Sequence, residues 1–492
     1  MKKFILNSFY NVLVWIIPVI IMFISVPMFM KYLGNEVYGI YLLLNSIISL
    51  LSIINLGTAD SVIKYVAEFP SNNSKNIIDI INNAFLLNFI TSIIFAFIIL
   101  ISKNIIIIKF LKVNNNSYYN DIIILLSLIL VISLFTGNFI SFFKAIQSYR
   151  IIMIISTINN LVINIGIILL VMSGYKLKGI LVYNLFICML NFLVYYYLLK
   201  KNLNNYRLKL QYNKIIFNNI FNFSKFSFLN AVCSIFIFNS DKLFIGYFFN
   251  TSMVTLYTIP SNLSMKLQGF FGAALNNIFP KVSEISSSKD IQKLKLYYVK
   301  LTKYTVLALI LICIPACFYS FKLLTYWVGV QTAEKTYVLL IISFISYTLL
   351  SLTVLPYYYF NGLGLPKYNF YVSFIGGISA ILFNLLLIYK FNLIGAAIAT
   401  LLSSLLSCMY SLYKAHILLL KPKYDRIVVK DIILIIFYSF ICYVLNNFVT
   451  NLLSLIFICF INLIIYLFII MRFNFLDKEE KLFILRRVNY VK

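Results

Sequence analysis

The sequence predicts an all-α polytopic membrane protein with about fourteen transmembrane helices. Three observations support this fold class: an apolar composition, a series of apolar runs long enough to span a bilayer, and an uneven distribution of basic residues. Of the 492 residues, 62% are hydrophobic and 11% are charged, and the mean hydropathy is +0.95. A soluble chain of this length would leave much of that apolar surface in water, so a bilayer is the expected solvent.

Apolar runs of roughly 20 residues, which cross a hydrocarbon core about 30 Å thick, define the predicted helices. The first run is longer than a signal-peptide core and no small-residue cleavage site follows it, so we expect an uncleaved span. Residues 105–111 are too short to cross and are expected at the interface. The fourteen predicted spans are 11–30, 38–57, 84–101, 122–143, 151–172, 177–199, 226–249, 254–279, 304–326, 337–360, 368–389, 393–415, 432–448 and 452–471.

The loops between these spans set the orientation. With a cytoplasmic N-terminus, 30 Lys and Arg residues lie on the cytoplasmic side and 9 on the opposite side, with Lys242 and Lys266 inside spans. The positive-inside rule therefore predicts cytoplasmic N- and C-termini in the cytoplasmic membrane.

An internal repeat divides the chain. Shifting it by 216 residues aligns 36–47 with 252–263 and 174–184 with 390–400, which matches Tyr41 with Tyr257. Because six spans separate the repeats, both have the same orientation in the membrane, as in transporters with parallel lobes. The predicted divisions are a six-helix lobe 1–200, a basic cytoplasmic linker 201–225, a second six-helix lobe 226–416, and two extra helices with a tail at 417–492.

Several function classes find no support in the sequence. The net charge of +27 lies in loops, and no soluble domain presents a basic face to nucleic acid. The seven cysteines lie in apolar segments without CxxC spacing, and His416 is the only histidine, so no metal site or His-based triad is expected. The sequence contains no P-loop motif, so direct use of ATP is not expected. We also expect that the protein uses no cofactor and is not an enzyme.

Spans one to twelve carry strings that resemble the lipid-linked oligosaccharide flippases, the O-antigen and capsule repeat-unit exporters of the multidrug/oligosaccharidyl-lipid/polysaccharide exporter superfamily. The strings, in order, are PMFMKYLGNEVYGIY, NLGTADSVIKYVAE, NSDKLFIGYF, LYTIPSNL, IFPKVSE, YFNGLGLPKYN and FNLIGAAIAT. The resemblance implies two six-helix lobes plus two helices, and flipping of an undecaprenyl-diphosphate-linked oligosaccharide from the inner to the outer leaflet by alternating access.

Other readings stay open. The multidrug and cation antiporters share the fold but usually have twelve spans, and the peptidoglycan-precursor flippases typically carry arginines in helices one, two and eight, which this chain lacks. A membrane polysaccharide polymerase or acyltransferase is the alternative from a different class. Besides the glycan lipid and the bilayer, a proton or sodium ion and the polymerase and chain-length proteins of the pathway are candidate partners.

Charged residues inside the spans are the first candidates for a substrate or ion cavity. Asp241 lies near the outer end of span seven and Lys266 lies in span eight at nearly the same depth, so we expect the two to meet. One alternative is a structural ion pair. In the other, Lys266 contacts the diphosphate or acidic sugars of the substrate, and Asp241 is its partner or a proton or cation site. In that second case, Lys266→Ala is expected to abolish flipping. Lys242 is about 100° around the helix from Asp241 and is expected to point elsewhere.

Two further groups are candidates at the cytoplasmic side. Asp60, Lys64 and Glu68 follow span two at helical spacing and form either a gate at the cytoplasmic mouth or a solvated stripe. Lys144 and Arg150, between spans four and five, either hold phosphate or anchor lipid headgroups.

Overall fold

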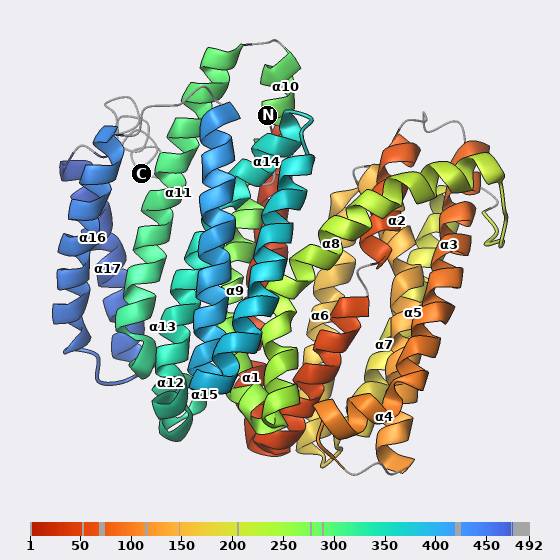
Figure 1. Ribbon diagram of the computed structural model, residues 1–492, viewed down its shortest axis with the longest axis horizontal. Helices are drawn as coiled ribbons and strands as arrows, with labels where there is room; N and C mark the ends of the chain where they lie inside the picture. Colours follow the sequence, from red (N-terminus) through yellow and green to blue (C-terminus); the bar gives the residue numbers. More distant parts are fainter. Residues whose placement is uncertain are drawn as a thin grey trace.

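A computed structural model shows two groups of long helices, one from each half of the chain, with a further helix pair at one edge (Figure 1). The structure describes residues 2–51, 54–67, 74–113, 117–146, 148–203, 206–275, 278–287, 290–418, 425–473 and 475. All regular elements in these ranges are helical, and nine helical segments in them are long and apolar enough to cross a membrane. The predicted fold class, an all-α polytopic membrane protein, is confirmed.

The N-terminal half begins with a helix that contains the first predicted span and most of the second. Gly34 breaks its axis with φ 74° and ψ 167°, a conformation that costs glycine little because it has no Cβ. The helices of this half are α1 (Lys2–Leu51), α2 (Ile54–Ala67), α3 (Ser74–Ile101), α4 (Lys103–Ile105), the π-helical turn η1 (Ile106–Phe110), α5 (Ser117–Ala145), α6 (Tyr149–Met172) and α7 (Leu177–Asn202).

In the C-terminal half, two predicted spans likewise lie in one continuous segment, α15, as two helices separated by a kink at Asn392, which has φ 54°. Every one of the fourteen predicted spans overlaps a helix, although several helices extend well beyond the predicted bounds. The helices of this half are α8 (Lys214–Phe248), α9 (Thr251–Leu275), α10 (Ile278–Ser287), α11 (Ile291–Phe318), α12 (Ser320–Val328), α13 (Val330–Leu352), α14 (Val354–Gly362), α15 (Lys367–Leu418), α16 (Asp425–Asn446) and α17 (Leu452–Arg472).

Equivalent contacts recur in the two halves at the offset of 216 residues. The Tyr41 phenol interacts with the side chain of Asn184, and the Tyr257 phenol interacts with the side chain of Thr400. In both halves a tyrosine near the start of the second span thus meets a polar residue on the sixth span. The repeat seen in the sequence therefore corresponds to matching side-chain contacts.

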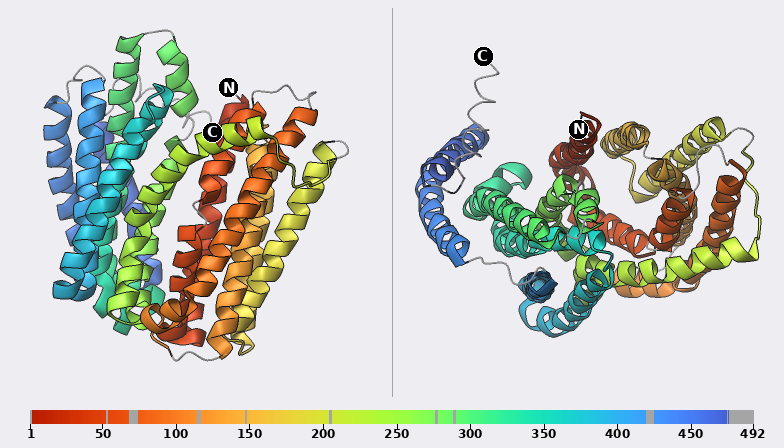
Figure 2. Two further views of the ribbon diagram at one scale, coloured as in Figure 1. Left: turned by 45° about the vertical axis from the view of Figure 1, so that its right-hand side comes forward. Right: turned by 90° about the horizontal axis from the view of Figure 1, so that it is seen from above.

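The long helix α8 connects the two groups of helices and begins before the predicted span. It starts at Lys214, capped by Asn213, whereas the sequence predicted a linker to residue 225. Its first turns pack on the N-terminal half, where Ser61 Oγ donates to the Ile220 carbonyl at 3.3 Å. The preceding segment, residues 206–213, packs on α3, where the Tyr206 hydroxyl donates to Asn82 Oδ1 at 3.3 Å. Figure 2 shows α8 crossing from one group to the other.

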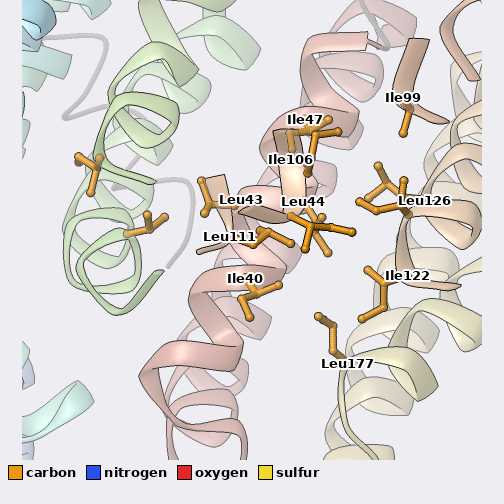
Figure 3. Packing of buried hydrophobic residues seen from close by; sticks show 14 of the residues in the cluster. Ile40, Leu43, Leu44, Ile47, Ile99, Ile106, Leu111, Ile122, Leu126 and Leu177 are labelled. Carbon is orange, nitrogen blue, oxygen red and sulfur yellow. The ribbon is translucent and has the colours of Figure 1, made fainter. Parts of the chain in front are cut away.

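The two halves meet in a buried apolar seam, defined here as the cluster that joins α1, η1, α5 and α7 to α8, α9, α13 and α15. Figure 3 shows its N-terminal side, including Ile40 and Leu43 of α1 with Leu177 of α7. The fragment 105–111, which the sequence places at the membrane interface, contributes Ile106, Ile107 and Leu111 to this seam, and their burial removes apolar surface from solvent.

Backbones approach closely across the seam. A Cβ on Gly39 would lie 1.8 Å from the Thr251 carbonyl oxygen, and Thr255 Oγ1 donates to the Asn35 carbonyl at 2.6 Å. Lys112 of the N-terminal half donates from Nζ to the Phe248 carbonyl at 3.1 Å, at the end of α8. The seam therefore closes the end of the molecule that carries the α8–α9 turn.

The last two helices pack against α11 and α12 at the edge away from the N-terminal half (Figure 2). Asn462 of α17 donates to the Tyr319 hydroxyl at 2.7 Å, and Tyr466 donates to the Leu307 carbonyl at 2.6 Å. Lys322 donates from Nζ to the carbonyls of Asn446 and Val449. These polar contacts fix the helix pair to the C-terminal half.

Candidate functional site

A cavity of about 910 Å³ lies among the helices of the C-terminal half, with α1 forming its remaining wall. Along α8 its residues precede the seam, so the seam separates the cavity from the α8–α9 turn. It is lined by Leu42, Asn45, Ser46, Ser234, Ile237, Phe238, Asn239, Lys242, Thr258, Asn262, Met265, Gln268, Gly269, Gly272, Leu350, Thr353, Val354, Tyr357, Tyr358, Asn369, Val372, Ser373, Ser407 and Ser411.

Amide side chains reach this cavity from four helices. They are Asn45 of α1, Asn239 of α8, Asn262 and Gln268 of α9, and Asn369 of α15. Each primary amide offers both hydrogen-bond donors and acceptors, and the serine, threonine and tyrosine hydroxyls of the lining do the same. Such a surface suits a ligand that is rich in hydroxyl and amide groups.

Lys242 adds positive charge to this polar surface. Its side chain is 7% exposed and its Nζ lies 3.4 Å from Asn262 Oδ1, so it extends from α8 toward α9 along the cavity wall. A lysine at membrane depth is costly unless it faces a polar cavity or a partner. Within the described lining Lys242 is the charged side chain, and it would attract an anionic group in the cavity.

Asp241 lies behind the cavity wall, in the interface of α8 with α9 and α15. It is 1% exposed, and its Oδ1 accepts a hydrogen bond from the Lys242 backbone N–H at 2.8 Å. Its carboxylate interacts with the Tyr257 phenol and attracts the Lys242 ammonium, although the two charges do not form an ion pair within 4 Å. A buried carboxylate without a close cation is a candidate for binding a proton or a small cation.

A further polar contact between α8 and α15 lies one residue before Asp241 on α8. Asn384 of α15 donates from Nδ2 to Ser240 Oγ at 3.2 Å, and Ser240 is the neighbour of Asp241 on α8. The Asn384 Oδ1 atom is buried and has no hydrogen-bond partner. A buried acceptor without a partner can accept a hydrogen bond from a donor or bind a cation.

The predicted meeting of Asp241 and Lys266 is wrong. The two side chains are both described and form no ion pair, and Lys266 is absent from the cavity lining while its neighbour Met265 lines it. Lys242, expected to point elsewhere, is the lysine that faces the cavity. The rotation of α8 and α9 about their axes decides which side chains face each other, and only packing sets that rotation.

The cytoplasmic candidates remain separate from the cavity. Lys144, at the end of α5, and Arg150, at the start of α6, are exposed and form no ion pair with another described side chain. The backbone of α2 includes Asp60 and Lys64, but their side chains and the whole of Glu68 lie outside the described residues.

Sequence reasoning missed most of the cavity wall because it concentrated on charges. Asn45, Asn239 and Asn369 were available as a signal, since each is an amide inside or beside an apolar run where burial requires a hydrogen-bond partner. Asn369, for example, donates to Asn361 Oδ1 at 2.8 Å. The amides on different helices could not be assigned to a common cavity without the fold.

Comparisons with known proteins agree with this arrangement of a polar cavity in a bundle of apolar helices. The chain belongs to the polysaccharide biosynthesis protein family, whose sequence pattern it matches over residues 4–286. It is 23% identical over 401 residues, 80% of this chain and 93% of the relative, to a provisionally named O-antigen transporter of Shigella flexneri. It is also 26% identical over 213 residues to a provisionally named low-salt glycan biosynthesis flippase, Agl15, of Haloferax volcanii; this match spans 42% of the chain and 44% of that relative.

Solved structures confirm the fold. The lipid II flippase MurJ in an inward closed conformation matches with a TM-score of 0.76 at 15% identity, covering 95% of this chain and 98% of that one. An inward-facing multidrug transporter of the MATE family, within the MOP superfamily, matches with a TM-score of 0.63 at 14% identity over 83% of this chain and 98% of that one. The chain is therefore a polysaccharide-biosynthesis transporter of the MOP fold, in the class of the oligosaccharide flippases that the sequence resembles.

Proposed function

We propose that this protein flips an undecaprenyl-diphosphate-linked oligosaccharide repeat unit from the inner to the outer leaflet of the cytoplasmic membrane, for the synthesis of a surface polysaccharide. The observation that carries the proposal is the polar cavity of about 910 Å³ inside a bundle of apolar helices. Moving a diphosphate-sugar head through hydrocarbon without such a cavity would carry a prohibitive desolvation cost. The prenyl tail stays in lipid while the head crosses.

The side chains that line the cavity and the seam beside it each have a role in this proposal. The amides and hydroxyls bind sugar hydroxyl and acetamido groups, and Lys242 binds a phosphate or an acidic sugar. In the predicted orientation the seam lies at the outer end, so the cavity of this conformation loads from the inner leaflet. Alternating access then requires that the seam between α1 and α9 opens.

Reconstitution tests the proposed function directly. Liposomes containing the purified protein and a fluorescent undecaprenyl-diphosphate oligosaccharide are expected to expose the glycan to an external glycosidase faster than protein-free liposomes. A deletion strain is expected to accumulate the lipid-linked repeat unit in the inner leaflet. Unchanged glycan exposure together with export of cationic drugs would replace the proposal with a multidrug antiporter, and polymer formation or acyl transfer by the purified protein would replace it with an enzyme.

We also propose that Asp241 binds the coupling ion, a proton or sodium. The buried carboxylate, the unpartnered Asn384 Oδ1 and the neighbouring Ser240 supply acceptors in one interface. Asp241→Asn is expected to abolish the response of glycan flipping to an imposed proton or sodium gradient while the protein remains folded. A mutant that still responds to both gradients would remove Asp241 from the coupling mechanism.

A further inference from the structure

A shallow groove of about 760 Å³ lies on the N-terminal half, where α6 ends and where α5 and α7 begin. It is separate from the polar cavity of about 910 Å³. Its residues come from the connection between α6 and α7, from the first turns of α7 and from Tyr118 at the start of α5. None of them lines the cavity described above.

Two glycines line this groove. Gly174 has φ 83°, and a Cβ built on it would meet no heavy atom within 4 Å. Gly179 lies under the side chain of Tyr175, whose nearest atoms would be 3.1 Å from an added Cβ. The backbone is therefore exposed at one point of the groove and an aromatic ring covers it at another.

The wall that runs along α7 is apolar and accessible. Val182 is 48% exposed and Phe186 is 56% exposed, one turn apart on the same face of the helix, and Leu170 of α6 faces them. In a membrane helix an exposed apolar face of this kind contacts hydrocarbon chains.

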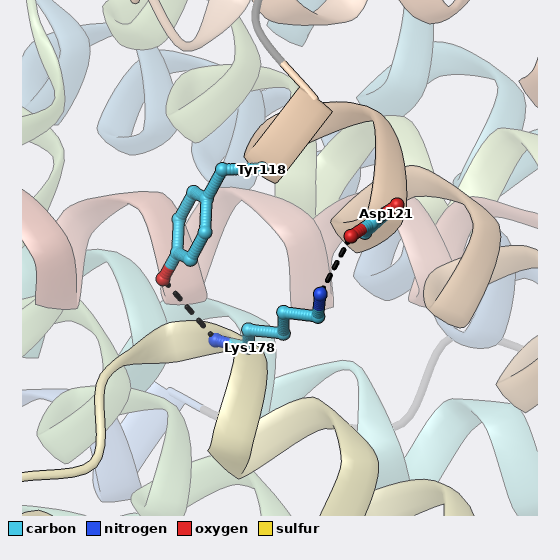
Figure 4. Close-up of polar contacts among 3 residues, drawn as sticks. All are labelled: Tyr118, Asp121 and Lys178. Atoms are coloured by element: carbon cyan, nitrogen blue, oxygen red, sulfur yellow. Dashed lines mark hydrogen bonds and ion pairs between the residues drawn. The ribbon is translucent and has the colours of Figure 1, made fainter.

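The mouth of the groove carries two lysines. Lys178 donates to Asp121 Oδ2 at 2.6 Å, and its backbone N–H donates to the Tyr118 hydroxyl at 3.4 Å (Figure 4). Lys176 is exposed and forms no ion pair with a described side chain, and as the N-cap residue of α7 it provides no side-chain cap for the helix. Two cations and one anion thus surround the start of α7, where the helix dipole favours a phosphate.

We propose that this groove binds one anionic phospholipid of the surrounding leaflet. Its phosphate lies between Lys176 and the first turn of α7, and one acyl chain follows Val182 and Phe186. The basic mouth above an apolar wall matches the polarity of such a lipid. Lys178 is already paired with Asp121, so Lys176 supplies the positive charge that attracts the phosphate. The site is independent of the cargo cavity, so this inference does not rest on the proposed function.

Native mass spectrometry of the full-length protein tests the proposal. The protein is released from nanodiscs of equimolar phosphatidylcholine and phosphatidylglycerol, and the lipids that remain bound are counted. Wild-type protein is expected to retain phosphatidylglycerol preferentially, and Lys176→Gln is expected to reduce that preference about fivefold, since one basic residue near an anionic headgroup contributes on this scale. Val182→Asn, at an exposed position, is expected to reduce retention of both lipids.

Lys390→Gln is the matched control, because Lys390 is also an exposed lysine at a helix turn but lies outside the groove. It is expected to keep the wild-type preference, and thermal unfolding of each variant verifies that it is folded. Equal retention of the two lipids by wild-type protein, or an unchanged preference in Lys176→Gln, would overturn the proposal.

Discussion

At the scale of single residues, two neighbours on α8 point into different surroundings. Asp241 lies in the packed interface with α9 and α15, and Lys242 lies on the cavity wall. Their counterparts at the repeat offset in the first half are Ser25 and Val26, which carry no charge. The charged pair is therefore a feature of the second half alone, added to a symmetric framework.

Lys242→Gln is expected to reduce glycan flipping roughly tenfold or more, because a hydrogen bond to a charged group is worth about 1.5–3 kcal/mol. Initial rates in proteoliposomes at fixed glycan-lipid concentration measure the effect. Lys242→Arg is expected to retain most of the activity.

Lys266→Gln provides the comparison that discriminates between the two lysines. Lys266 is also a lysine inside a predicted span but does not line the cavity. If its loss impaired flipping and the loss of Lys242 did not, the cargo contact would return to Lys266, where the sequence had placed it.

At the scale of elements, close packing of α1 on α9 closes one end of the molecule. Gly39→Ala is expected to open this seam, because its Cβ would lie 1.8 Å from the Thr251 carbonyl oxygen and the helices must separate. The measurement is the labelling of a Ser46→Cys side chain, in a variant without native cysteines, by an impermeant maleimide added outside. Labelling is expected to increase in Gly39→Ala.

Gly272→Ala serves as the control, since an added Cβ there meets no heavy atom within 4 Å. It is expected to leave the labelling unchanged. Equal labelling of the parent, Gly39→Ala and Gly272→Ala would show that the α1–α9 contact is not the outer barrier.

The docking of α16 and α17 depends on a lysine that binds two backbone carbonyls. Lys322→Met is expected to destabilise the α16–α17 turn by about 1.5–3 kcal/mol, because it removes charge-assisted bonds to Asn446 and Val449. Limited proteolysis near this turn and thermal unfolding in detergent measure the loss. The exposed Lys335→Met is the control, and equal protease sensitivity of both variants would contradict the role of Lys322.

At the scale of the whole molecule, the distribution of basic residues predicts the orientation. In a variant without native cysteines, Lys390→Cys is expected to react with an impermeant maleimide in intact cells, whereas Lys293→Cys reacts only after the membrane is permeabilised. Both lysines are exposed, so the difference reports sidedness. The reverse pattern would invert the proposed direction of loading.

How much of the fold could be predicted differs between features. The all-helical membrane fold followed from the sequence because apolar run length is a local property, and every predicted span overlaps a helix. The start of α8 at Lys214 could not be predicted from the sequence, because residues 214–225 are polar enough to resemble a loop. They are helical in the structure, where they pack against α2 and α3. Asn82 and Asn83 hold the segment before it, a contact more than 120 residues distant in sequence.

By itself, the sequence determined that the chain is an all-helical membrane protein with two repeated halves, because the bilayer permits few ways to satisfy a backbone in an apolar chain. It also identified Asp241 and Lys242 as charged residues inside a span, where burying a charge costs free energy unless it faces a partner or a polar cavity. Only the tertiary structure decided that Lys242 faces the cavity, that Asn384 of α15 meets Ser240, and that Lys266 forms no ion pair with Asp241. The physical reason is that helix rotation is set by packing between helices, which no single helix encodes.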